Sequence, residues 1–139
     1  MEDGQIIIHT DGGSRSNPGP AASAFVVEKD GKTIYEGSKF LGKATNNVAE
    51  YTGVIIALQW LLENSTRYPV SSIQFILDSE LVVKQLKGLY KVKDENLRNL
   101  FFEIFSLIKK INSKVTFQHT LRAGNKRADF LVNEELDRN

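Results

Sequence analysis

Two aspartates of the sequence follow directly on apolar, β-branched runs. Asp11 comes after Gln5–Thr10, and Asp78 comes after Ser72–Leu77. Runs of this kind are typical of buried strands. If the two strands lie side by side and parallel, both carboxylates emerge at the same edge of the sheet, which is the edge where open α/β sheets bind their ligands.

Two further acids lie on helical patterns. Glu50 precedes Val54 by four residues and Leu61 by eleven, a spacing that predicts a position on the core-facing stripe of its helix. Asp129 repeats this pattern, three residues before Val132 and seven before Leu136, which predicts a position on the apolar stripe near the start of another helix. A charge in apolar surroundings is tolerated only when it is paired or bound to a metal ion. Both acids are therefore candidates for a functional site.

Each of these acids has a simpler structural explanation when it is taken alone. Asp11 fits a turn, and Asp78 fits the cap of the following helix. Glu50 and Asp129 fit first helical turns, where the helix dipole favours acids. Together, however, the four carboxylates would repel one another, because no lysine or arginine occupies a matching position. Divalent cations would remove that repulsion, and oxygen ligands alone favour Mg²⁺ or Mn²⁺, ions that typically act on phosphate esters.

The rest of the sequence excludes several other site chemistries. It contains no cysteine, which rules out thiol catalysis, thiolate zinc sites and disulfides. It has no Walker-type phosphate loop, no two-histidine zinc motif and no serine nucleophile elbow. Gly12, Gly13 and Gly19 are spaced as turn residues and do not match a dinucleotide-binding fingerprint. Metal-dependent chemistry on phosphate esters is therefore favoured.

The pattern of apolar residues predicts the elements that position these acids. Alternating and β-branched runs predict five strands, at residues 5–10, 22–29, 33–41, 72–77 and 114–119, with a hairpin turn at Asp30-Gly31. Helical spacing predicts helices over residues 45–64, 79–87, 94–112 and 125–137, of which the middle two could form one kinked unit. An antiparallel meander followed by strands that alternate with helices predicts an α/β fold, a five-stranded mixed sheet with helices on both faces.

Length and charge limit the kind of protein. The 139 residues predict a single domain, residues 1–139, with enough chain for an apolar core. Lysine and arginine (18) almost balance aspartate and glutamate (17), and the net charge of +1 argues mildly against a nucleic-acid-binding protein. The N-terminus, Met1–Gln5, is polar and acidic, and the apolar stretches are too short to cross a membrane. We therefore expect a soluble, cytoplasmic protein.

Four motifs give the sequence a family resemblance. They are Thr10–Ser14 with Asn17–Gly19, Thr45–Tyr51, Leu77–Val82, and His119 with Asn125–Asp129. Each is weak alone, but in this order and nearly end to end they resemble the type 1 ribonucleases H, in the compact form found in archaea and many bacteria. The resemblance implies the ribonuclease H-like fold and an endoribonuclease that hydrolyses the RNA strand of RNA/DNA hybrids, leaving 5′-phosphate and 3′-hydroxyl ends.

The resemblance also implies roles for the acids and for one histidine. In the family, four carboxylates hold two Mg²⁺ ions, with Mn²⁺ as the expected substitute, and their matches here are Asp11, Glu50, Asp78 and Asp129. One ion activates the attacking water and the other stabilises the leaving 3′-oxygen, with Asp11 as the shared ligand. His119 matches a loop histidine that assists proton transfer or product release, although a strand-end histidine without a catalytic role stays open. His9, inside the first strand, is interpreted as structural.

Substrate-binding residues follow from the same resemblance. Asn17 and Asn46 match residues that read the minor groove of the hybrid. The backbone around Ser14 and Ser16 matches the segment that contacts the RNA 2′-hydroxyls, the groups that distinguish RNA from DNA. Ser16 stands where the family usually has glycine, so the loop is strained if this position needs a positive φ.

Other substrate positions are more ambiguous. Thr45 and Asn47 match a pocket for a DNA-strand phosphate, but Thr and Asn are also common at helix N-termini. Glu80 occupies a position where several relatives have Gln, and its charge near the minor groove could weaken binding. The chain also lacks the basic insertion of some relatives. Four lysines in that region fit either a phosphate-contacting patch or a solvated helix face: Lys84, Lys87, Lys91 and Lys93.

Two other functions remain open besides a hybrid-specific nuclease. One is a non-catalytic hybrid-binding module, which the presence of all four acids disfavours, because negative charge weakens binding to phosphates. The other is a related nuclease that cuts transposon ends or DNA junctions, which Asn17 and the Asn46-Asn47 pair disfavour. We expect an RNA/DNA hybrid as the partner, no membrane, and a monomer without an obligate protein partner. Two bound Mg²⁺ ions would make the site positive, so the net charge is a weak objection, and binding should be weak and salt-sensitive.

Overall fold

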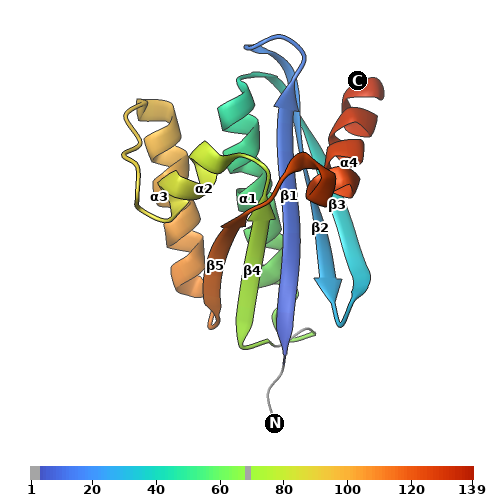
Figure 1. The fold of residues 1–139 in the computed structure, drawn as a ribbon, viewed down its shortest axis with the longest axis vertical. Coiled ribbons are helices and arrows are strands. Elements are labelled where there is room, and N and C mark those ends of the chain that lie inside the picture. The colour runs from blue at the N-terminus through green and yellow to red at the C-terminus, as the bar shows by residue number, and fades with distance from the viewer. Residues whose placement is uncertain (1–3, 68–69) are drawn as a thin grey trace.

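A five-stranded mixed sheet forms the centre of the molecule (Figure 1). The computed structural model describes residues 4–67 and 70–139, so Met1–Asp3 of the polar N-terminus lie outside the described residues. The strands are β1 (Gln5–Ser14), β2 (Gly19–Lys29), β3 (Lys32–Ala44), β4 (Ser72–Leu77) and β5 (Lys114–His119), in the order β3-β2-β1-β4-β5. β1, β2 and β3 are antiparallel neighbours, whereas β4 runs parallel to both β1 and β5. The predicted mixed sheet is confirmed.

The helices follow the predicted order. They are α1 (Asn46–Glu63), α2 (Glu80–Leu86), α3 (Glu95–Lys110) and α4 (Lys126–Asp137), and a short 3₁₀ turn, η1 (Arg122–Asn125), precedes α4. Three of them begin at a side chain that accepts a hydrogen bond from the first turn: Thr45 for α1, Ser79 for α2 and Asp94 for α3. Ser79 rather than Asp78 caps α2, which leaves the Asp78 carboxylate available for another role. No helix in the described part of the chain is long and apolar enough to cross a membrane.

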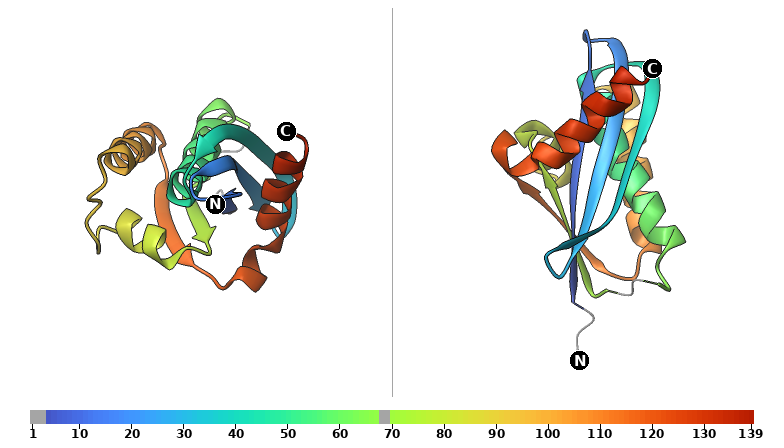
Figure 2. Two further views of the ribbon diagram at one scale, coloured as in Figure 1. Left: turned by 90° about the horizontal axis from the view of Figure 1, so that it is seen from above. Right: turned by 90° about the vertical axis from the view of Figure 1, so that its right-hand side faces the viewer.

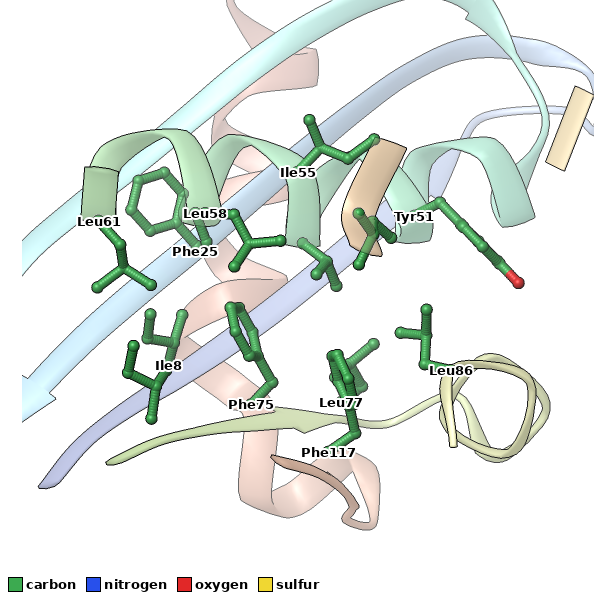
Figure 3. Close-up of a cluster of buried hydrophobic side chains, with 14 of the residues drawn as sticks. Ile8, Phe25, Tyr51, Ile55, Leu58, Leu61, Phe75, Leu77, Leu86 and Phe117 are labelled. Carbon is green, nitrogen blue, oxygen red and sulfur yellow. The ribbon is translucent and has the colours of Figure 1, made fainter. Parts of the chain in front are cut away.

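The two faces of the sheet carry different helices (Figure 2). α1 covers one face together with α2 and α3, and α4 packs on β2 and its neighbours on the other. Because side chains alternate along a strand, Phe25 and Val27 of β2 join the α1 cluster, whereas Ala24 and Val26 contact α4. Figure 3 shows the larger cluster, in which Phe75 of β4 lies beneath the apolar side of α1.

β1 is longer than the sequence pattern predicts. Pairing with β2 continues from Ile6↔Lys29 to Ser14↔Ala21, so Asp11 lies within the strand and does not end it. Gly12, which resembles a turn residue in the sequence, serves a different purpose, because α1 packs directly on this part of β1. A Cβ at Gly12 would collide with the backbone of Ala49 and Glu50. The interpretation of residues 11–14 as a turn is therefore wrong, and the close helix–strand approach is the physical reason for glycine.

Candidate metal centre and nucleic-acid interface

Three of the four predicted acids meet at one edge of the sheet. β1 and β4 are parallel neighbours with His9 opposite Ile76, and this register brings Asp11 level with Asp78, directly after β4. Glu50 joins them from the first turns of α1. One carboxylate oxygen from each of Asp11, Glu50 and Asp78 lies within 4.8 Å of the others. The predicted meeting of Asp11 and Asp78 at a common edge is therefore present in the structure.

Close backbone packing places Glu50 in this cluster. α1 rests on β1 at Gly12, whose N–H lies 3.4 Å from the Glu50 Oε1 atom that accepts from it. The buried Ser23 hydroxyl of β2 donates a hydrogen bond of 2.6 Å to the Ala49 carbonyl. Gly53, one turn further along α1, leaves no room for a larger residue without pressure on the Asp11 carbonyl, 3.0 Å from an added Cβ. The start of α1 is thus held against β1 and β2 by close backbone packing at Gly12 and Gly53 and by the hydrogen bonds of Glu50 and Ser23.

The three carboxyl groups are in an unfavourable electrostatic setting without a cation. Burial raises the pKa of Asp11 to about 7, and the charge of Asp78 acts in the same direction. Burial, followed by the charge of Asp11, raises the pKa of Glu50 well above its ordinary value. Burial also raises the pKa of Asp78, which is only half-buried. Each of these groups would gain from a positive charge placed between them.

The donor set fits a hard divalent cation. Among the described residues, the Glu50 Oε2 atom is buried without a hydrogen-bond partner, an arrangement that is costly in a finished protein. Asp11, Glu50 and Asp78 offer only carboxylate oxygens, the ligands that Mg²⁺ and Mn²⁺ prefer. A bound cation would satisfy the orphaned oxygen and remove the repulsion between the three groups.

Asp129 lies at the same cleft but is exposed. Its negative charge raises the pKa of both Asp11 and Asp78, so it is electrostatically part of the cluster. The interpretation of Asp129 as a residue on the buried stripe is wrong. α4 buries Ala128, Leu131, Val132 and Leu136 against the sheet. Asp129 lies beside that stripe, on the side of α4 that lines the cleft.

The acids line a cleft of about 400 Å³, and two arginine side chains, Arg15 and Arg122, line it as well. Its lining comes from the end of β1 and the residue after it, the start of α1, the two residues after β4, the start of η1 and one side of α4: Asp11, Gly12, Gly13, Ser14, Arg15, Asn46, Asn47, Glu50, Asp78, Ser79, Arg122, Asp129, Val132, Asn133 and Leu136. Arg122, in η1, lowers the pKa of Asp78 through its charge. Sequence reasoning missed Arg122, because an isolated arginine before a motif does not differ from an ordinary surface cation.

The two histidines lie in different places. His119 is half-buried at the end of β5, opposite Leu77, and its charge lowers the pKa of Asp78 less than that of Arg122 does. His9 Nδ1 lies 3.2 Å from the Asn125 Oδ1 atom, and the Asn125 amide donates 2.8 Å to the Thr10 carbonyl. This agrees with the structural interpretation of His9. Asn125 is nearly fully buried and ties the start of α4 to β1. Sequence reasoning did not predict this role.

The predicted substrate loop is linked to α1 by two amide side chains. The Ser14 N–H donates to Asn46 Oδ1 over 2.8 Å, and the Asn46 N–H donates to Asn17 Oδ1 over 3.0 Å. Both side-chain oxygens are therefore used within the protein, and neither NH₂ group donates a hydrogen bond to another described residue, so both are available to a ligand. Ser16 has a φ of 89°, so this position does need a positive φ, the condition under which the sequence predicted a strained loop, and its carbonyl accepts a hydrogen bond from the Ser14 hydroxyl.

The remaining predicted substrate residues divide between the cleft and the surface. Asn47 lines the cleft. The Thr45 hydroxyl accepts from the Val48 N–H, which is the helix-capping role that the sequence left open. Glu80 is exposed, outside the cleft lining, and lies 3.6 Å from Lys84 in an ion pair. The Lys84 ammonium also lies 5.2 Å from the centre of the Tyr90 ring, and Lys87, Lys91 and Lys93 are exposed.

Comparison with known proteins places this chain among nucleases. Residues 9–135 match the family model described as reverse transcriptase-like. Ribonuclease HI of Halobacterium salinarum is 40% identical over 135 residues, which are 96% of this chain and 65% of that protein. The bifunctional protein Rv2228c of Mycobacterium tuberculosis is 37% identical over 96% of this chain but only 36% of its own length. The chain thus spans between about a third and two thirds of these curated relatives.

The fold has a close counterpart among solved structures. LC11-RNase H1, solved in complex with an RNA/DNA hybrid, is 41% identical and superimposes with a TM-score of 0.91. The match covers 96% of this chain and 97% of that one. The five-stranded sheet and its helices are therefore those of a known nuclease fold over nearly the whole length of both chains.

Proposed function

Because the chain belongs to the type 1 ribonuclease H family, we propose that it is an endoribonuclease that hydrolyses the RNA strand of RNA/DNA hybrids. The observation that carries the proposal is the cluster of Asp11, Glu50 and Asp78, with an orphaned buried carboxylate oxygen, in a cleft that Asp129 also lines. A relative of similar sequence and fold was solved with such a hybrid, which supports this substrate class.

The acids of the cleft would hold two divalent cations, Mg²⁺ or in its place Mn²⁺, with Asp11 as the shared ligand. When bound, such ions activate the attacking water and stabilise the leaving 3′-oxygen, which gives 5′-phosphate and 3′-hydroxyl ends. Burial disfavours the negatively charged forms of Asp11 and Glu50, and a bound cation would stabilise them. Asp129, on the exposed side, completes the set where substrate and solvent enter.

Two side chains next to the acids take supporting roles. Arg122 lines the cleft beside Asp78 and would attract the phosphate of the bound strand, because its guanidinium matches phosphate geometry. His119, at the end of β5, would assist proton transfer or product release with its imidazole.

The loop after β1 and the start of α1 would select the hybrid. Asn17 and Asn46 use their amide oxygens within the protein, so their NH₂ groups are oriented to donate to the acceptors that bases present in the minor groove. The backbone around Ser14 and Ser16 would contact the RNA 2′-hydroxyls. Asn47, with Thr45, would bind a phosphate of the DNA strand, and Glu80 at the edge would weaken rather than add affinity. We expect a monomer to suffice for this reaction.

A panel of labelled substrates tests the proposal. Wild-type protein in Mg²⁺ or Mn²⁺ is expected to cut the RNA strand of an RNA/DNA hybrid and to leave single-stranded RNA, duplex DNA and branched DNA intact. The Asp78→Asn variant, folded by circular dichroism, is expected to lose cleavage. Hybrid binding without cleavage by wild-type protein would identify a binding module instead, and cleavage of branched DNA alone would identify the related nuclease.

A further inference from the structure

Arg15 connects the loop after β1 to the far end of α4. Its Nη2 atom lies 2.6 Å from Asp137 Oδ1 and 3.4 Å from the Asn133 carbonyl, to which it donates. Its backbone N–H donates 2.8 Å to the Pro20 carbonyl, which fixes the loop at this point. Figures 1 and 2 show the β1–β2 loop and the C-terminal end of α4 at the same end of the molecule. The Arg15 side chain therefore spans the gap between two elements that border the cleft.

The Arg15–Asp137 ion pair is poorly suited to a purely stabilising role. Its two side chains are 48% and 68% exposed, and exposed ion pairs contribute about 0–1 kcal/mol. Asp137 is also the last residue of α4, where the helix dipole disfavours a carboxylate. An arginine held by so weak a partner can exchange it for a stronger one, and a phosphate binds the planar guanidinium through two parallel hydrogen bonds.

The position of Arg15 relative to the acids indicates what that stronger partner is. Arg15 and Arg122 are the two cations among the described residues that line the cleft, and Arg122 acts on Asp78. Asp137 follows Asp129 by eight residues, so the Arg15 head lies roughly 12 Å along α4 from Asp129, the acid of α4 that lines the cleft, at 1.5 Å per residue. Since each strand of a duplex carries a phosphate about every 3.4 Å of its axis, this distance corresponds to a phosphate several nucleotides from the one that is cut.

We propose that Arg15 is a phosphate-binding residue that exchanges Asp137, its partner in the free protein, for a backbone phosphate of the bound nucleic acid. The inference rests on the proposed function and goes beyond it, because the substrate residues assigned above on this loop are amides, hydroxyls and backbone groups. It makes Asp137 a competitor of the substrate for Arg15. Removal of the arginine and removal of its partner must then change affinity in opposite directions.

Binding measurements on a non-cleaving parent separate these effects. Fluorescence anisotropy of a labelled RNA/DNA hybrid is followed in Mg²⁺ at several salt concentrations, with Asp78→Asn as the parent protein. Adding Arg15→Ala should weaken binding about 5- to 10-fold and reduce the slope of log K against log[salt] by about 0.7–0.9, the contribution of one phosphate contact. Adding Asp137→Asn should strengthen binding about 2- to 5-fold, and it should have no effect once Arg15 is alanine.

A matched control and two contrary outcomes complete the test. Arg138 pairs with Glu134 and Glu135 at the same end of α4 but does not line the cleft, so Arg138→Ala should change neither affinity nor slope by more than twofold. Weaker binding with Asp137→Asn, or an unchanged salt slope with Arg15→Ala, would overturn the proposal in favour of a structural tie. If Arg15→Ala lowers the melting temperature, the affinity of the Asp137→Asn variant decides between a phosphate-binding and a structural role, because that variant keeps the arginine. If the Asp78→Asn parent does not bind hybrid, both this inference and the proposed function are overturned. If the parent binds but Arg15→Ala changes neither the affinity nor the salt slope, this inference alone is overturned.

Discussion

The two faces of the sheet hold their parts of the site in different ways. On the α1 side, large apolar residues pack beneath the helix, and Gly12 lets its backbone rest on β1 next to Glu50. On the α4 side, the buried cluster is small and rich in alanine, and polar contacts tie the helix to β3: the exposed Arg127–Glu36 ion pair and the partly buried Ser38–Glu135 hydrogen bond. The difference indicates one half of the site that is fixed by packing and one half that can adjust when substrate binds.

The largest contrast should be between the acids of the two halves. Asp78→Asn is expected to reduce cleavage at least about 1000-fold, because it removes a proposed metal ligand from the packed cluster and with it several kcal/mol of transition-state stabilisation. Asp129→Asn, on exposed α4, is expected to reduce it about 10- to 50-fold and to raise the metal concentration needed for half activity. Single-turnover rates over a Mg²⁺ titration measure both. Equal losses would mean that the α4 half is as essential and as fixed as the other.

The packed half should also make the metal-free protein sensitive to pH. The Asp11 pKa is raised from 3.8 to about 7 in the folded state, so between these values the folded protein holds a proton that the unfolded chain releases. The contribution of Asp11 to stability is then full below about pH 4 and falls as pH rises towards 7, by at most about 4 kcal/mol at 1.36 kcal/mol per pH unit. Thermal melts in EDTA at pH 5 and pH 8 test this.

Two additions sharpen that pH experiment. Mg²⁺ at pH 8 should recover the lost stability, because a cation replaces the proton between the carboxylates. Asp11→Asn should reduce the pH dependence and leave the part that the buried Glu50 contributes, whereas Asp129→Asn on the exposed side should leave most of it in place. A metal-free protein that is equally stable at both pH values would contradict the electrostatic strain assigned to Asp11.

Addition of a single methyl group at Gly12 should disrupt the contact between α1 and β1. Gly12→Ala places a methyl group against the backbone of Ala49 and Glu50, which cannot rotate away. Overpacking of this kind destabilises by about 1–3 kcal/mol, and displacement of Glu50 should lower the cleavage rate about 100-fold. Gly13→Ala is the matched control, because its added methyl group would meet only Val132 Cγ1 at 3.5 Å. Similar rates and melting temperatures for the two variants would show that the close approach is unimportant.

The smallest effect is expected in the loop between the two halves. Ser16 has a φ of 89°, a region that strains a side chain but not glycine. Ser16→Gly should therefore stabilise the protein by about 0.5–1 kcal/mol, since the relief of strain exceeds the entropy that glycine adds to the unfolded chain. Chemical denaturation measures the change, and cleavage should stay within twofold. A loss of stability would show that contacts of the serine side chain outweigh the strain.

Local signals predicted most of the fold. β4 and β5 begin and end at the predicted residues, because each is a short apolar run between clear breaks. Thr45, Ser79 and Asp94 are helix caps whose side chains reveal the helix starts. The length of β1 could not be predicted in the same way, because the reason for Gly12 is a helix that arrives from 37 residues further along the chain.

The site residues were predictable where the pairing of strands or the apolar stripe of a helix determines their position. Asp11 and Asp78 follow from two parallel strands, and Glu50 follows from the apolar stripe of its helix. The exposure of Asp129 depends on how α4 is rotated on the sheet, and a three-residue spacing to Val132 does not determine that rotation. Arg122 and Arg15 are recognisable only through their three-dimensional neighbours, since an isolated arginine in a loop has no distinguishing pattern.

The most direct test of the central claim is the chemistry of the cut ends. We would digest an RNA/DNA hybrid with wild-type protein in Mg²⁺ and analyse the ends of the RNA fragments by mass spectrometry, with EDTA and Asp78→Asn as blanks. A metal-dependent attack by water that displaces the 3′-oxygen predicts 5′-phosphate and 3′-hydroxyl ends, which disappear in both blanks. Fragments with 2′,3′-cyclic phosphates, or cleavage that persists in EDTA, would contradict it, because such cuts use the RNA 2′-hydroxyl and need no carboxylate-bound cation.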